Sequence, residues 1–278
     1  MIDEQTQDAM IQLVRTVAKA EILPRFRRLG ASDVSTKTGP EDLVTEADVN
    51  AEAAIAAGVR TLLPDALIVG EEAAEANPDL LGQIADAPLS VIVDPVDGTW
   101  NFAKGLATFG VILAVAERGE TVFGLLYDPV LDDWIWTRRG GGAWYATAAG
   151  DARRLTLSPP TSEDLTGFVP LFNFPRAVRL RLADEMPGLR RIWSVRCSCH
   201  EYRTLVFAGA DFCVSNALKP WDHAAGALAV SEAGGAVGLM DGRPYRASIT
   251  SGGSLVTARS ASVLAHIRAT MSALLDGA

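Results

Sequence analysis

The sequence predicts a mixed α/β fold in which an antiparallel sheet comes first and alternating strands and helices follow. Two hairpins, over residues 109–127 and 134–146, predict the antiparallel sheet. In the rest of the chain, short apolar runs alternate with segments of helical spacing. We therefore expect two subdomains, residues 1–155 and 156–278, which meet near residues 151–160.

The N-terminal half begins with a predicted amphipathic helix over residues 4–28. Met10, Val14 and Val17 recur there at helical spacing, and Gly30 ends the pattern. The elements that follow are a loop or irregular hairpin (35–45), a helix (46–63), a strand (68–69), a helix (77–87) and paired strands (109–116 with 121–127, 134–138 with 143–146).

The C-terminal half has the alternating pattern. Its predicted elements are strands at 168–171, 192–197 and 212–214 and helices at 176–185, 200–208, 222–232 and 261–275. Gly234 and Gly235 end the helix that begins at Asp222.

Composition restricts the class of protein. The chain has 278 residues and a net charge of −9, which argues against a nucleic-acid-binding surface because such surfaces are basic. The N-terminus lacks the basic and apolar segments of a signal peptide, and no apolar run reaches the roughly 18 residues of a membrane span. Three cysteines do not suggest a disulfide framework. We expect a cytoplasmic protein that contacts neither membrane nor nucleic acid directly.

The segment of residues 91–102 carries the strongest chemical signal. Val91, Ile92 and Val93 predict a buried strand, which we expect to stop at the proline that follows Asp94 because proline cannot donate to a ladder. Asp97 comes three residues after Asp94, and a turn and a helical start over residues 98–102 follow.

This arrangement suits a phosphate held with Mg²⁺. Carboxylates bind hard cations, and the backbone N–H groups at a helix start bind anions. The structural alternative is an ordinary strand–turn–helix in which Asp94 and Asp97 are turn and cap residues. An EF-hand is excluded, because Gly105 stands where its twelfth-position glutamate is needed.

Further acidic residues stand where strands or loops meet helices. Glu71 and Glu72 follow a short strand, Asp48 follows Thr45 in a capping-box pattern, and Asp222 opens an alanine-rich helix. Each has a structural explanation when taken alone. Taken together with Asp94 and Asp97, they are the kind of carboxylate set that holds two metal ions for an in-line displacement.

These segments resemble the inositol monophosphatase family. The similar blocks are residues 41–48 (EDLVTEAD), 70–72 (GEE), 94–102 (DPVDGTWNF) and 221–235 (WDHAAGALAVSEAGG), in the order and at the separations of that family. The resemblance implies the layered α-β-α-β-α sandwich of the inositol monophosphatase and fructose-1,6-bisphosphatase type. It also implies a homodimer and a lithium-sensitive, Mg²⁺-dependent phosphatase.

The resemblance further implies two to three Mg²⁺ ions. The first would bind Glu71, Asp94 and the carbonyl of Val96, and the second would bind Asp94, Asp97 and Asp222. A third, weaker ion would bind Glu71 together with waters.

Catalytic and substrate-binding roles follow from the same resemblance. Thr99, hydrogen-bonded to Asp48, would help deprotonate the attacking water, with Glu72 in support. The N–H groups of Gly98 and Thr99 would hold the phosphate, Lys37 would orient waters nearby, and Asp222 would also face the substrate.

The segment that reads the substrate departs from the family pattern. Where the family usually has small residues, this chain has His200, Glu201 and Tyr202. We expect His200 and Glu201 to line the pocket for the alcohol part of the substrate; the alternative is a cap and a surface pair on the following helix. The family often has an acid near Asn216 or Ala217, and this chain has none there.

The predicted activity is hydrolysis of a small polyol or sugar phosphate similar to inositol-1-phosphate. Histidinol phosphate and fructose-1,6-bisphosphate are alternative substrates within the same fold. A different class of function, also known among bacterial relatives, is a non-catalytic partner in a transcription-associated assembly. A dinucleotide-binding oxidoreductase is excluded because no G-x-G-x-x-G follows a strand.

Overall fold

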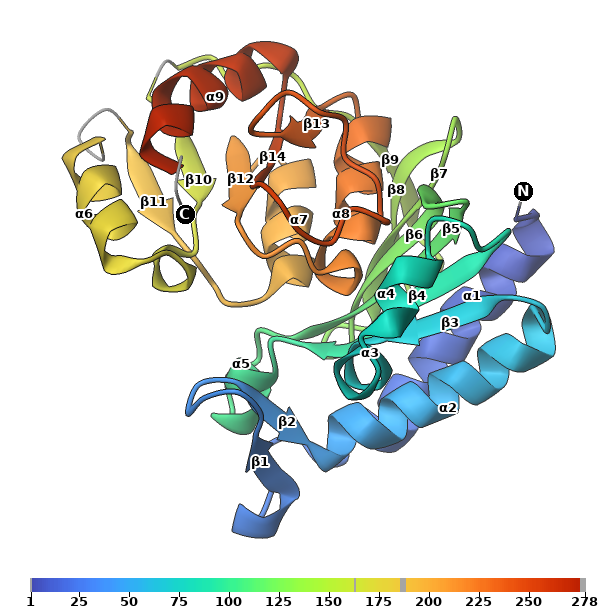
Figure 1. The fold of residues 1–278 in the computed structure, drawn as a ribbon. Helices are drawn as coiled ribbons and strands as arrows, with labels where there is room; N and C mark the ends of the chain where they lie inside the picture. The colour runs from blue at the N-terminus through green and yellow to red at the C-terminus, as the bar shows by residue number, and fades with distance from the viewer. Residues whose placement is uncertain (1, 163, 186–188, 276–278) are drawn as a thin grey trace.

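Five alternating layers of helix and sheet make up the chain in the computed structural model (Figure 1). The structure describes residues 2–162, 164–185 and 189–275. The outermost residues of the two predicted subdomains, 1 and 276–278, lie outside this described part. The layers follow the order helix, sheet, helix, sheet, helix, as the resemblance implies.

The first helical layer contains α1 (Glu4–Val17) and α2 (Glu46–Leu62), which cover one face of a seven-stranded sheet (Figure 1). Met10 and Val14 of α1 and Ile55 of α2 are fully buried against that face. The capping box of α2 is present as predicted. The first helix is shorter than predicted, since a π-helical turn at Ala18–Ile22 ends it.

The large sheet has the strand order β3-β4-β5-β6-β7-β8-β9. Only β3 and β4 pair in parallel, and the other neighbours pair antiparallel, which confirms both predicted hairpins. The strands are β3 (Leu67–Gly70), β4 (Ser90–Asp97), β5 (Gly110–Glu117), β6 (Glu120–Asp128), β7 (Asp133–Arg138), β8 (Gly142–Thr147) and β9 (Ala152–Leu155).

The middle layer contains α7 (Ser198–Val206) and α8 (Pro220–Glu232), which lie between the two sheets (Figure 1). The alanines of α8 allow it to approach β6 closely. A Cβ atom on Gly124 of β6 would lie 2.8 Å from the Cα atom of Ala225, so a larger residue would push helix and strand apart. This close packing brings the first turn of α8 to the end of β4.

The second sheet has the order β11-β10-β12-β14-β13, and α6 (Arg176–Glu185) and α9 (Ala261–Leu275) cover its outer face. Its strands are β10 (Thr166–Phe168), β11 (Arg191–Trp193), β12 (Phe212–Ser215), β13 (Ala236–Leu239) and β14 (Leu255–Ala258). The large sheet uses strands up to Leu155 and this sheet uses strands from Thr166 onward. The division of the chain into two subdomains stays a prediction.

The prediction that the strand stops at the proline after Asp94 was wrong. Strand β4 continues through Pro95 to Asp97, and its pairing with β5 shifts register between Asp94 and Asp97. A bulge is one of the few places in a sheet that tolerates proline, because its N–H is not needed there. This shift in register lies between Asp94 and Asp97, and the carboxylates of both residues are directed toward the same end of the sheet.

Other element boundaries also differ from the prediction. The helix predicted over residues 77–87 is the shorter α4 (Asp79–Gln83), and the preceding α3 (Glu71–Ala76) was missed. Strands β9, β13 and β14 were also missed, and β11 ends before the predicted limit. Residues 35–45 form a hairpin of β1 (Val34–Thr36) and β2 (Leu43–Thr45). Within the described residues, no helix is long and apolar enough to span a membrane.

Candidate active site

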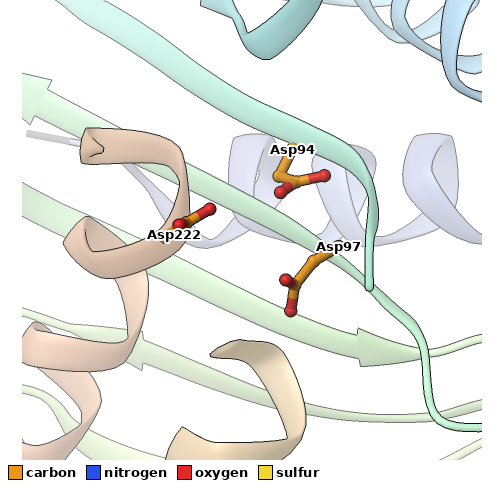
Figure 2. Close-up of side chains that lie close together, drawn as sticks. All are labelled: Asp94, Asp97 and Asp222. Carbon is orange, nitrogen blue, oxygen red and sulfur yellow. The ribbon is translucent and has the colours of Figure 1, made fainter. Parts of the chain in front are cut away.

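Three aspartates meet where β4 ends beside α8 (Figure 2). Asp94 and Asp97 come from β4, and Asp222 lies in the first turn of α8. Each offers a carboxylate oxygen within 4.8 Å of those of the other two. Figure 2 shows the three carboxylates directed into a shared space from the strand and the helix.

The electrostatics of this cluster suit a bound cation. Burial, together with the charges of Glu71, Asp97 and Asp222, raises the pKa of Asp94 well above its usual range. Burial and the charge of Asp222 raise the pKa of Asp97 to about 8. Burial raises the pKa of Asp222 to about 6, against the nearby charge of Lys219. Oxygen ligands that repel one another in a buried place fit a hard divalent ion such as Mg²⁺.

The start of α7 orients Asp97. The backbone N–H of Cys199 donates to Oδ2 of Asp97 at 2.5 Å, and Sγ of Cys197 lies 3.1 Å from the same oxygen. Both cysteines are free thiols, as expected, and both are buried. Sequence reasoning missed this contact, because a backbone N–H leaves no signature in residue types.

Glu71 begins α3 and lies among lysines at the edge of the cluster. Its Oε1 is 3.4 Å from Nζ of Lys37 and 3.5 Å from Nζ of Lys219. Lys37 also pairs with Glu72 at 2.6 Å and with Glu75 at 2.9 Å. Lys219 and Glu75 were not predicted to take part; Lys219 directly precedes the residues that open α8, which is the signal that could have indicated it.

Charge balance in this network favours ionised partners. Burial by itself would lower the pKa of Lys37, but the carboxylates of Glu71, Glu72 and Glu75 raise it above its ordinary value. Burial raises the pKa of Glu72 to about 7, and its bond to Lys37 opposes that rise. Lys37 therefore stays a cation beside the predicted metal ligand Glu71.

Asp48 serves the fold and the site with different oxygens. Its Oδ2 accepts hydrogen bonds from the N–H of Thr45 at 2.9 Å and from Oγ1 of Thr45, which completes the capping box of α2. Its Oδ1 lies 3.0 Å from Oγ1 of Thr99. Burial raises the pKa of Asp48 to about 6, against the hydrogen bonds from Thr45. The structural and functional interpretations of Asp48 are thus both consistent with its geometry.

Gly98 connects the metal cluster to a helix start. It precedes α5 (Thr99–Ala103) and has a φ of +88°, a left-handed conformation that L side chains rarely adopt. The first N–H groups of any helix have no partner inside the helix. Gly98 and Thr99 line the same cleft as Asp97 and Asp222, so this helix start lies beside the aspartate cluster.

A cleft of about 200 Å³ opens beside these groups. Its lining includes Gly98, Thr99, Glu71, Asp97 and Asp222. The remaining residues on its walls come mainly from residues 41–43, 170–173, 194–202 and 213–223. The cleft thus joins the metal cluster to the segment predicted to read the substrate.

The substrate-reading segment is only partly where it was expected. Glu201 and Tyr202 line the cleft, but His200 is not among its described lining residues. Nε2 of His200 lies 3.1 Å from the carbonyl oxygen of Phe109, because that side of α7 packs on the large sheet. Oε1 of Glu201 accepts hydrogen bonds from Oγ of Ser194 at 2.8 Å and from the N–H of Val195 at 2.9 Å.

Comparison with known proteins agrees with this geometry. The sequence model that describes the inositol monophosphatase family matches residues 3–273 of this chain. The chain belongs to the inositol monophosphatase family. The family is in general one of Mg²⁺-dependent, lithium-sensitive phosphatases, and the resemblance predicted from sequence is confirmed.

Relatives in this family carry two kinds of name. The chain is 31% identical over 241 residues to the fructose-1,6-bisphosphatase/inositol-1-monophosphatase of Thermotoga maritima, covering 86% of this chain and 87% of that one. It is 33% identical over 213 residues to the Nus factor SuhB of Vibrio cholerae, and the match covers 73% of this chain and 74% of that one. A solved structure of a Thermotoga maritima IMPase has a TM-score of 0.79 at 27% identity and covers 97% of this chain and 98% of its own. The predicted layered fold is confirmed; the homodimer and the cytoplasmic location stay predictions.

Proposed function

We propose that the protein is a Mg²⁺-dependent phosphomonoesterase that hydrolyses a small polyol or sugar phosphate. The single observation that carries the proposal is the convergence of Asp94, Asp97 and Asp222. The Thr99–Asp48 pair lies close to this cluster, because Thr99 is two residues after Asp97 and both residues line the same cleft. A cation site beside a polarised hydroxyl and a helix start matches what phosphoryl transfer to water needs.

The metal ligands are assigned as follows in this proposal. Glu71, Asp94 and the carbonyl of Val96 would hold one Mg²⁺, and Asp94, Asp97 and Asp222 would hold a second. A third ion at Glu71 belongs to the proposal as well. When bound, Mg²⁺ would make a coordinated water more acidic and neutralise charge that develops on the phosphate.

The chain's own residues would move the proton. Oγ1 of Thr99 lies 3.0 Å from Oδ1 of Asp48 and 2.9 Å from the carbonyl oxygen of Val96. A hydroxyl donates only one proton, so it bonds one of these acceptors at a time. With the carbonyl of Val96 committed to a cation, Asp48 would be the acceptor. Thr99 would then take a proton from the attacking water as its own proton passes to Asp48.

Glu72 and Lys37 act as supports in this proposal. Their 2.6 Å ion pair keeps both beside Glu71. The N–H groups of Gly98 and Thr99 would orient the phosphate, and Asp222, which lines the cleft, would also face the bound ester.

The cleft supports a small, polar alcohol. Its volume of about 200 Å³ is below the range typical of sites for drug-sized ligands. Arg196 stands at the cleft between Trp100 and Phe172, with its guanidinium 4.3 Å and 5.1 Å from the two ring centroids. Oε1 of Glu201 already accepts two hydrogen bonds from the protein, so it is less available to the alcohol part of the substrate. The name of the Thermotoga relative supports sugar and inositol phosphates as the class to test.

A phosphate-release screen tests the proposal. The purified protein would be assayed with Mg²⁺ and with EDTA on inositol phosphates, histidinol phosphate, sugar phosphates, fructose-1,6-bisphosphate and adenosine bisphosphate. We expect Mg²⁺-dependent release that is greatest for polyol or sugar monoesters. A preference for another class of ester would overturn the substrate assignment, and no release from any ester would overturn the enzymatic one.

A second candidate is a binding role in a transcription-associated assembly. The similarity to Nus factor SuhB favours it, since the chain covers about three quarters of that relative. The net charge of −9 gives no support for direct contact with RNA. Affinity capture from lysate with wild type and with Asp97→Asn would test it: capture of transcription proteins by both would support a role that does not depend on catalysis.

A further inference from the structure

Glu52 ties two helices of the site together. It lies on α2 one turn after Asp48, and its side chain reaches the start of α3. Its Oε2 accepts the backbone N–H of Glu72 at 2.8 Å, and its Oε1 accepts the N–H of Ala73 at 2.9 Å. One carboxylate therefore caps the N-terminus of α3 with both oxygens, although it belongs to another helix.

Gly70 makes room for this cap. A Cβ atom at Gly70 would lie 2.1 Å from Cδ of Glu52 and 2.3 Å from its Oε2. The backbone of Gly70 is extended, with φ −91° and ψ 161°, a conformation open to any residue. Space for the carboxylate of Glu52, and not backbone freedom, is thus the reason that a glycine suits this position.

The cap encloses the predicted metal ligand. Glu71 stands between Gly70, which admits the carboxylate, and Glu72, which donates to it. Helix α3 has only 6 residues, so by itself it is too short to be stable in water. A carboxylate at a helix N-terminus satisfies free N–H groups and interacts favourably with the helix dipole. The direction in which Glu71 leaves the backbone therefore depends on Glu52.

We propose that Glu52 is a positioning residue for the metal site: its carboxylate, admitted by Gly70, fixes the first turn of α3 so that Glu71 faces Asp94. The inference rests on the proposed function in one respect, that Glu71 binds Mg²⁺. Asp48 and Glu52, four residues apart on α2, then have separate positioning roles. Asp48 orients Thr99, and Glu52 orients Glu71.

The test measures Mg²⁺ affinity directly, by calorimetry and by the rise in melting temperature on adding Mg²⁺. Loss of a group that orients a metal ligand typically weakens binding about 10- to 100-fold. We expect Glu52→Ala to weaken Mg²⁺ binding by about that factor, while kcat at saturating Mg²⁺ stays near the wild-type value. Glu52→Gln keeps one acceptor oxygen and should fall between wild type and Glu52→Ala.

Gly70→Ala provides an independent route to the same defect. The added methyl group would displace the carboxylate of Glu52, so this variant should weaken Mg²⁺ binding as Glu52→Ala does. The double variant should be no weaker than either single one, because both changes remove the same interaction. Glu46→Gln is the matched control, since Glu46 is an exposed carboxylate in the first turn of the same helix.

The outcomes separate this inference from the proposed function. Unchanged Mg²⁺ affinity in folded Glu52→Ala or Gly70→Ala, with or without a lower melting temperature, would overturn the role of Glu52 and leave the phosphatase proposal standing. A wild type that binds no Mg²⁺ would contradict both. Circular dichroism would confirm that each variant is folded before its affinity is compared.

Discussion

Oγ1 of Thr99 lies 3.0 Å from Oδ1 of Asp48, whose other oxygen caps the helix on which Asp48 stands. Because the cap holds the carboxylate in place, its free oxygen is presented to Thr99 without further cost in side-chain entropy. Positioned proton transfer typically contributes about 10²- to 10⁴-fold to a rate. Thr99→Ala should therefore lower kcat by about 10²-fold or more and change KM little, as measured by steady-state phosphate release.

Two variants control this prediction. Thr99→Ser keeps the hydroxyl and should retain most of the activity. Thr61→Ala removes an exposed threonine hydroxyl on α2, far along the helix from Asp48, and should have no effect on kcat. An unchanged kcat in Thr99→Ala would remove Thr99 from the mechanism.

The three clustered aspartates should lower the stability of the metal-free protein and be required for Mg²⁺ binding. Asp94, Asp97 and Asp222 repel one another in a buried place, so the metal-free protein is destabilised by them. Asp97→Asn or Asp222→Asn removes one of these ionisable groups and its share of the repulsion, so the melting temperature in EDTA should be equal to or above that of wild type. The same variants should lose phosphatase activity and the rise in melting temperature that Mg²⁺ produces in wild type.

Thermal unfolding with and without Mg²⁺ checks this expectation. Asp241→Asn is a control, because Asp241 is exposed and pairs only with Arg243 among the contacts of its side chain described here. Wild-type turnover in Asp97→Asn or Asp222→Asn would contradict the two-metal assignment.

Glu201 should make stability depend on pH. Burial raises its pKa from 4.5 to about 7, against the hydrogen bonds from Ser194 and Val195. The folded state therefore binds more protons than the unfolded state between these values. The contribution of Glu201 to stability is complete below the pKa of this group in the unfolded state and is lost as pH rises through about 7. Between about pH 5 and pH 8, wild type should lose roughly 1–3 kcal/mol of unfolding free energy relative to Glu201→Gln.

Urea unfolding of both proteins in EDTA at the two pH values measures this difference. Glutamine at position 201 cannot ionise, so it removes only the titration of this one group. Parallel pH dependence in wild type and Glu201→Gln would show that the carboxyl of Glu201 keeps its ordinary pKa.

Gly98 should tolerate no side chain. A Cβ atom there would lie 2.9 Å from the carbonyl oxygen of Thr108 and would require a left-handed residue with φ +88°. Gly98→Ala should lower the free energy of unfolding by about 1–3 kcal/mol and raise KM for the phosphate ester, because the helix start that follows would move. Urea unfolding and steady-state kinetics check both effects.

Gly140→Ala is the matched control for Gly98→Ala. Gly140 has a similar φ of +73°, but a Cβ atom there meets nothing within 4 Å. Gly140→Ala should therefore cause only the strain of a left-handed backbone at a non-glycine residue, and it should leave KM unchanged. Equal effects of the two substitutions would show that the contact with Thr108 is unimportant.

Prediction from the sequence succeeded where one local rule dominates. The hairpins that join β5 to β6 and β7 to β8 combine apolar strands with glycine-containing turns, and both were found. It failed at Pro95, since the bulge that accommodates proline depends on pairing with β5. It also missed α3, whose Glu- and Ala-rich sequence shows no apolar face; Glu52, a residue of α2, caps this helix.

The same distinction applies to His200 and Glu201. They are neighbours in sequence, and both were predicted to line the pocket. Successive residues of a helix point in directions about 100° apart. Packing of α7 on the large sheet turns His200 toward Phe109, and Glu201 is left on the cleft side. Residue type could not decide between them.

The sequence by itself determined the inventory of chemical groups: the carboxylates at the ends of elements, the threonine after Gly98, and the family to which these blocks belong. Tertiary structure alone decided which atoms meet. The N–H of Cys199 reaches Asp97, Lys219 reaches Glu71, and Glu52 reaches the start of α3. These contacts join segments that are distant in sequence, and some use backbone groups that every residue carries. Only the packing of the layers brings such groups together.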